Sequence, residues 1–111
     1  MRLLAASSIA ILLAGCATTA PSQMYRGADH KGSAWEIAGE YNDFSKNVII
    51  KVNGQNAIDG NLPVFGSGGE VYGTYAGKNV TANCSRVTKM FSSYMQCMVF
   101  VANERAATLQ F

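Results

Sequence analysis

The feature that most constrains this chain is a succession of short segments, separated by tight-turn signals, in which apolar and polar residues alternate. Asn53-Gly54, Gly77-Lys78 and Asn103-Glu104 are such signals, because Asn and Gly tolerate the positive φ angles that two-residue hairpin turns require. The segments between and around the turns predict seven strands, over Ala34–Tyr41, Asn47–Asn53, Gln55–Leu62, Glu70–Ala76, Asn79–Val87, Tyr94–Ala102 and Arg105–Phe111.

This pattern predicts an all-β fold. No stretch has a convincing 3.6-residue apolar period, and glycine, with 11 of the 111 residues, interrupts every candidate helix. About seven short strands at this spacing predict a small antiparallel meander, which either closes into a barrel or packs as a two-sheet sandwich. Apolar residues make up 49% of the chain, which is enough for one modest core.

Residues 1–15 predict an export signal. Arg2 gives a cationic start, and the apolar run from Leu3 to Ala14 is too short for a permanent transmembrane helix, which needs about 20 apolar residues. The run ends in Leu13-Ala14-Gly15-Cys16, which resembles the lipobox of bacterial lipoproteins. The resemblance implies cleavage before Cys16, which then carries a diacylglycerol on its sulfur and an acyl chain on its nitrogen.

The same resemblance implies a location. Two or three acyl chains hold a protein firmly, because each buried methylene group contributes about 0.8 kcal/mol. Lipoproteins kept at the inner membrane of Gram-negative cells usually have Asp after the acylated cysteine, whereas Ala17 follows Cys16 here. We therefore expect an outer-membrane anchor with the domain facing the periplasm, and a surface-facing domain is left open. Apart from this covalent lipid, no cofactor is expected.

Residues 16–33 are predicted to be the acylated cysteine and a flexible tether. Ala17–Gln23 is small and polar, contains Pro21 and has no periodicity, which is typical of linkers. The β-rich periplasmic domain is then expected over residues 34–111.

The three cysteines divide by function. If Cys16 takes the lipid, Cys84 and Cys97 remain as an even pair. Each shares one face of a predicted strand with apolar residues, so the two thiols meet in the core if the strands are neighbours. Because the periplasm is oxidising, a disulfide between Cys84 and Cys97 is expected.

No catalytic or metal site is predicted, and we expect no enzyme activity. The single histidine, His30, lies between Asp29 and Lys31 without partners at ligand spacing. Ser67 lacks the G-x-S-x-G frame of a nucleophile, and Gly66–Gly69 lacks the Lys of a phosphate-binding loop. The formal net charge of +2 is too small and too scattered to indicate a nucleic-acid partner.

Outward-facing apolar residues form a candidate partner surface. Some of them oppose the core-facing side of a predicted strand, and others lie in the segment between the last two cysteines. The residues are Tyr72, Met90, Phe91, Tyr94, Met98 and Phe100. Alternatively, a strand buried on both faces, or the segment between the cysteines folding over them, covers these side chains. Both explanations stay open.

Together these features predict a non-enzymatic lipoprotein whose tethered β-domain binds or supports another cell-envelope component. One alternative is a lysozyme inhibitor, since the chain is similar in size, anchor and strand-rich body to the membrane-bound inhibitors of C-type lysozymes. Their Ser-Gly-x-x-Tyr loop is matched loosely, because Ser67-Gly68 precede Tyr72 with one residue too many. A second alternative is the surface or superinfection exclusion that some phage- and plasmid-borne lipoproteins perform.

Overall fold

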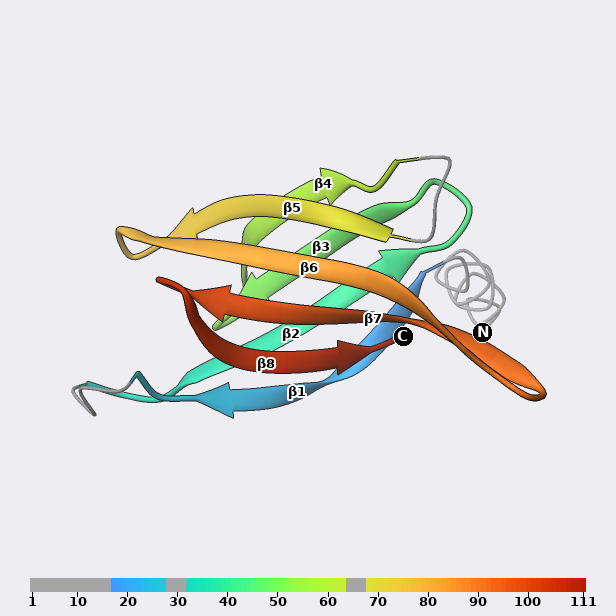
Figure 1. The fold of residues 1–111 in the computed structure, drawn as a ribbon. Helices are drawn as coiled ribbons and strands as arrows, with labels where there is room; N and C mark the ends of the chain where they lie inside the picture. The colour runs from blue at the N-terminus through green and yellow to red at the C-terminus, as the bar shows by residue number, and fades with distance from the viewer. Residues whose placement is uncertain (1–16, 28–31, 64–67) are drawn as a thin grey trace, which may run out of the picture.

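In a computed structural model, the chain forms a sandwich of two four-stranded antiparallel sheets (Figure 1). The structure describes residues 17–27, 32–63 and 68–111, so the predicted export signal, Cys16, His30 and Ser67 lie outside the described residues. The first sheet contains β1 (Thr18–Tyr25), β2 (Trp35–Asn42), β3 (Asn47–Val52) and β4 (Gln55–Asn61). The second contains β5 (Gly68–Tyr75), β6 (Lys78–Lys89), β7 (Ser92–Val101) and β8 (Glu104–Gln110).

Both sheets are meanders in which every strand pairs with its neighbour in the chain. The predicted all-β antiparallel fold is confirmed, and of the two architectures that the sequence left open the molecule adopts the sandwich, because the sheets do not close into a barrel.

The tether prediction is wrong for Thr18–Tyr25, which form strand β1 and bring the number of strands to eight. β1 pairs with β2 at the edge of the first sheet, and its register shifts between Ala20 and Gln23. Pro21 lies within this shift, and sheets tolerate proline at edges and bulges because it has no N–H to donate to a ladder. Ala20 is the one buried residue of β1, so the strand has no apolar alternation that the sequence could reveal.

Three two-residue turns gather at one end of the sandwich. They are Asn53-Gly54, Ala76-Gly77 and Ala102-Asn103, and all six residues have positive φ, as type I′ turns require. The first turn is as predicted. The other two lie one residue earlier than Gly77-Lys78 and Asn103-Glu104, because Lys78 and Glu104 already pair in the sheet.

The core lies between the sheets and follows the predicted alternation. Inward-facing residues are almost completely buried in both sheets, and among the described residues no polar or charged one is buried. The largest are Ile37, Val48, Ile50, Val52 and Ile58 from the first sheet, and Val80, Val99, Val101 and Leu109 from the second. Aromatic contacts cover the two ends: Trp35 packs edge-on against Tyr25 and Tyr75 at the turn end, and Tyr41 packs against Phe111 at the other.

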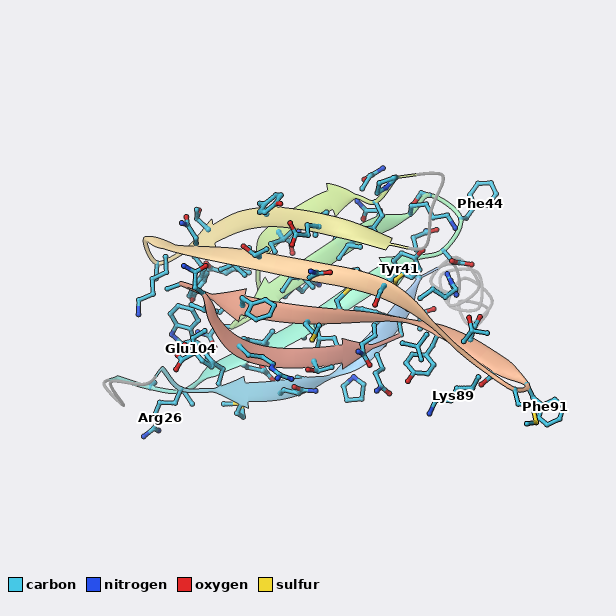
Figure 2. The ribbon with its side chains drawn as sticks, in the orientation of Figure 1. Arg26, Tyr41, Phe44, Lys89, Phe91 and Glu104 are labelled. Carbon is cyan, nitrogen blue, oxygen red and sulfur yellow. A yellow bond between two sulfur atoms is a disulfide. The ribbon has the colours of Figure 1, made fainter. Side chains whose placement is uncertain are left out.

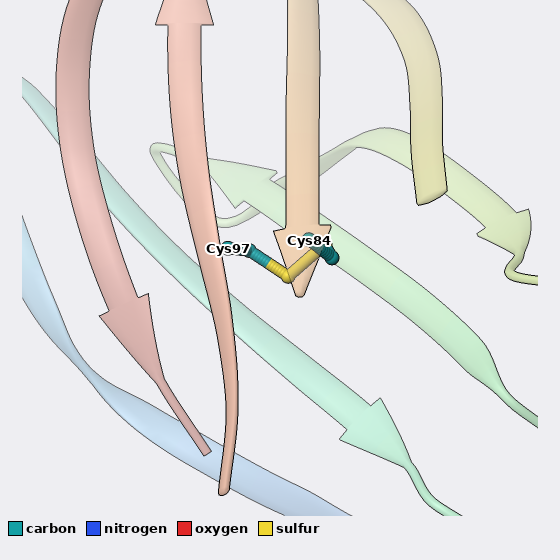
Figure 3. Close-up of a disulfide and its surroundings, with 2 residues drawn as sticks. All are labelled: Cys84 and Cys97. Carbon is teal, nitrogen blue, oxygen red and sulfur yellow. A yellow bond between two sulfur atoms is a disulfide. The ribbon is translucent and has the colours of Figure 1, made fainter. Parts of the chain in front are cut away.

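The predicted disulfide joins Cys84 of β6 to Cys97 of β7 (Figure 3). The two residues are direct partners in the ladder, with their Cα atoms 4.0 Å apart. So short a separation is typical of the non-hydrogen-bonded pairs of an antiparallel sheet, where opposite side chains come closest. Both cysteines are buried, so the bridge forms part of the core.

The edges of the two sheets cover each other. At one seam, Gln23 of β1 donates its Nε2 to the carbonyl oxygen of Thr108 in β8 at 2.5 Å, and accepts the Thr108 N–H at 3.0 Å. At the other seam, Gly73 of β5 packs against Ala57 of β4 so closely that a Cβ on Gly73 would lie 1.9 Å from the Ala57 carbonyl oxygen. The four edge strands therefore lie against each other in two pairs, β1 with β8 and β4 with β5.

Candidate functional site

The start of β1, the β2–β3 turn and the β6–β7 turn lie at the end of the sandwich opposite the three type I′ turns (Figure 1). Thr18 pairs with Tyr41 just before the β2–β3 turn, and it shares a hollow with Arg86 and Tyr94. We call this region, made of Thr18, residues 42–47 and residues 86–94, the hairpin end.

The longest hairpin of the molecule extends the hairpin end beyond the body of the sandwich (Figure 1). The predicted strands stopped at Val87 and resumed at Tyr94, whereas β6 and β7 continue pairing to Lys89 and Ser92. Met90-Phe91 is therefore a two-residue turn at the tip, and these side chains are 86% and 94% exposed. The alternative that this segment folds over the outer face of the sheet is wrong.

Phe44, which lay outside the predicted partner surface, is the most exposed large apolar residue described, at 97%. The turn that carries it is built by Asn42, whose Oδ1 accepts the N–H groups of Phe44 and Ser45 at 2.9 and 3.0 Å. This is the local side-chain turn that Asn favours. The sequence offered one signal for Phe44, which is the apolar residue in the otherwise polar stretch Asn42–Lys46.

An ionic cluster beside these turns joins the two sheets. Asp43 Oδ1 accepts the Tyr41 hydroxyl at 3.1 Å and Arg86 Nη2 at 2.7 Å, and Lys46 Nζ lies 3.5 Å from it. The hydrogen bond from Tyr41, assisted by the two cations, lowers the pKa of Asp43. Burial, and then the Asp43 carboxylate, raise the pKa of Tyr41. Arg86 is 43 residues from Asp43 in the chain, so no local pattern could predict the pair.

Asp43→Asn is expected to remove a small acid-sensitive part of the stability. Because the pKa of Asp43 is lower in the folded state, the unfolded chain binds its proton first as the pH falls. The contribution is therefore complete above the unfolded pKa of about 4, and it is lost as the pH falls through the folded pKa. Since the carboxylate is 66% exposed, its size should stay below about 1 kcal/mol. Urea unfolding at several pH values measures it, and an Asn variant whose stability falls as steeply below pH 4 as the native one contradicts it.

The predicted partner surface divides into two separate groups. Met90 and Phe91 lie at the hairpin tip, beside Tyr94, whose half-buried ring has Lys89 Nζ 6.0 Å from its centroid. Tyr72, Met98 and Phe100 instead lie on the outer face of the second sheet, and we call them the outer-face group.

Within the outer-face group, Tyr72 and Phe100 flank Thr81 of β6 in one row across the sheet. Met98 lies in the next row, opposite Asn83. Tyr72 is 67% exposed and donates its hydroxyl to Glu70 Oε1, whereas Met98 and Phe100 are half-buried. The group is therefore one exposed and two half-buried side chains that lie beside polar Thr81 and Asn83 on the side of the sandwich.

Chemistry-bearing groups are sparse in residues 17–27, 32–63 and 68–111. They contain no cluster of three or more His, Cys, Asp or Glu side chains placed to hold a metal ion, and no helix that is long and apolar enough to cross a membrane.

Two hollows of about 40 and 180 Å³ flank the Asp43 cluster. Both are smaller than the roughly 300–1,000 Å³ of a typical ligand pocket. The described part of Gly66–Gly73, residues 68–73, belongs to strand β5.

Comparisons with models of protein families, with curated proteins and with solved structures found no match to this chain. What the protein does must therefore be inferred from its own residues.

Proposed function

We propose that this protein is a non-enzymatic outer-membrane lipoprotein whose β-sandwich binds or supports another component of the cell envelope. The anchor is a lipid on Cys16, which ends the short apolar run in the order Leu13-Ala14-Gly15-Cys16. Acyl chains on this cysteine supply the membrane attachment.

The observation that carries the proposal is the position at which the fold begins. Ala17 is the single residue between Cys16 and strand β1, which starts at Thr18. Because each extended residue spans at most about 3.6 Å, the anchor lies within roughly 10 Å of the hairpin end. The sandwich then stands on the membrane by this end instead of moving on a long tether.

In this orientation the outer-face group lies on the side of the molecule, away from the membrane surface. Tyr72 is its most exposed member, and an exposed tyrosine beside half-buried apolar side chains is suited to a protein partner embedded in or lying on the same membrane. We place the binding of the envelope component here.

Membrane fractionation tests the anchor. The native protein should be found with the outer membrane, and a Cys16→Ser variant should leave the outer-membrane fraction almost completely, because it has lost every acyl chain. Ala17→Asp is the matched control, since it keeps the lipid and should shift the protein to the inner membrane. A Cys16→Ser variant that stays in the outer-membrane fraction would sink the proposal.

Crosslinking in the same cells tests the binding face. A photoreactive residue at position 72 should give one discrete adduct, whereas the same residue at Asn56, exposed on the first sheet, should give none. The adduct should disappear from the Cys16→Ser variant, because the partner is expected at the membrane. Equal labelling from positions 72 and 56 would rule out a dedicated outer face.

A further inference from the structure

We propose that the hairpin end is itself a lipid-binding surface, and that Phe44, Met90 and Phe91 insert into the headgroup region of the bilayer. This inference rests on the proposed anchor at Cys16 and adds a second contact that the folded protein makes with the membrane. The acyl chains hold the protein at the surface, and the inserted side chains fix its orientation there.

The exposed apolar side chains are concentrated at this end. Five large apolar residues among those described are highly exposed, and three of them belong to the hairpin end. The five residues are Met24, Phe44, Tyr72, Met90 and Phe91, and those of the hairpin end are Phe44, Met90 and Phe91. Figure 2 shows Phe44 and Phe91 projecting from the hairpin end, whereas Arg26 and Glu104 lie at the opposite end.

The requirements of the turn do not explain why the apolar residues Met90 and Phe91 occupy it. The three other two-residue turns use Asn, Gly or Ala in positive φ, whereas neither Met90 nor Phe91 has a positive φ. A turn without positive φ accepts most residues, so it does not require apolar ones, and water disfavours large apolar side chains at a tip. Apolar and aromatic side chains at the end of a rigid element are instead suited to the interface between headgroups and acyl chains.

The charges beside the apolar tips suit an anionic lipid surface. Lys46, Arg86 and Lys89 are the cationic side chains of the hairpin end, and Asp43 is its one carboxylate side chain. Asp43 is occupied by Arg86 and Lys46, whereas Lys89 is exposed at the base of the tip beside Tyr94. Basic residues that flank inserted apolar ones attract anionic headgroups and strengthen binding.

The start of the chain decides between a bilayer and a protein as the occupant. Cys16 is bonded to Ala17, and Thr18 lies at the hairpin end, so a lipid on Cys16 brings the membrane against this surface. A protein partner would have to enter between the domain and its own anchor. The bilayer is therefore the occupant that the geometry favours.

Depth-dependent quenching tests the inference on the full acylated protein. The protein is placed in vesicles of phosphatidylethanolamine and phosphatidylglycerol whose acyl chains carry bromine near the headgroup. Phe91→Trp and Phe44→Trp variants should each show a quenched tryptophan. Native Trp35 is the internal control, because it packs against Tyr25 and Tyr75 at the opposite end and should remain unquenched.

Two further variants separate orientation from general adsorption. Tyr72→Trp reports on the outer face and should be no more quenched than Trp35. In the Phe44→Trp protein, adding Phe91→Asp should lower the quenching towards the Trp35 level, because a carboxylate at the tip opposes insertion. Both positions are exposed, so near-ultraviolet circular dichroism should remain that of the native fold.

The outcomes test the docking of the hairpin end on the bilayer separately from the lipid anchor on Cys16. An unquenched Phe91→Trp, or a Tyr72→Trp quenched more strongly than Phe91→Trp, overturns the docking. Intact mass of the same preparation reports the acyl chains, so acylated protein with unquenched tips contradicts the docking and leaves the anchor standing. Protein without acyl chains but with a quenched Phe91→Trp supports the docking and refutes the anchor.

Discussion

A Cys84→Ala/Cys97→Ala double variant is expected to lose about 3 kcal/mol of unfolding free energy relative to the oxidised native protein. The bridge joins residues 13 positions apart, and chain entropy predicts about 3 kcal/mol for a loop of roughly this size. Alanine fills less of the core than the two sulfurs, which adds to the loss. For a domain of this length the melting temperature should fall by roughly 12–24 °C.

Thermal melting and urea unfolding of the two proteins measure this difference. Cys16→Ser is the matched control, because it also removes a cysteine but leaves the bridge intact, and its unlipidated domain should melt like the oxidised native one. Reducing the native protein should bring its melting temperature close to that of the double variant. A double variant that melts within a degree or two of the oxidised native protein would show that the bridge contributes little.

Gly73→Ala should cost about 2–3 kcal/mol, although it adds a single methyl group. That methyl group would stand 1.9 Å from the Ala57 carbonyl oxygen, which is backbone and cannot move aside without displacing β4 from β5. Overpacking of this kind typically costs about 1–3 kcal/mol, and a backbone obstacle places Gly73 at the upper part of that range. Because β4 and β5 form one of the two seams between the sheets, the loss affects how the sheets pack together.

Thr74→Ala is the control for Gly73→Ala. Thr74 is the next residue of β5 and is exposed, so its replacement should change the unfolding free energy by less than about 0.5 kcal/mol. Urea unfolding of both variants gives the comparison. If Gly73→Ala is as stable as Thr74→Ala, β4 and β5 do not approach each other as described.

Much of the fold could be predicted because burial leaves an alternating pattern in the sequence. The inward faces of β3, β6 and β7 follow this pattern, and it correctly predicted that Cys84 and Cys97 face the core and form a disulfide. The choice between a sandwich and a barrel could not be predicted, because it depends on contacts between edge strands that are far apart in the sequence. At one seam the side chain of Gln23, and not a backbone ladder, bonds β1 to β8.

Much of the candidate site could not be predicted, because its residues lie outside the core and leave no alternating pattern. Beyond Val87 the hairpin leaves the core, so neither face is buried and the polar Thr88, Ser92 and Ser93 show no alternation. β1 was missed because Ala20 is its one buried residue. Phe44 and the Asp43–Arg86 pair were missed because a turn and a contact between sheets have no periodic signature.

The division of the three cysteines between one anchor and one bridge is the central claim, and the intact mass of the protein purified from membranes tests it most directly. We expect a chain that begins at Cys16, carries three acyl chains there and has no free thiol, because Cys84 and Cys97 are joined. A chain that begins elsewhere, or an unmodified Cys16 thiol, would contradict it.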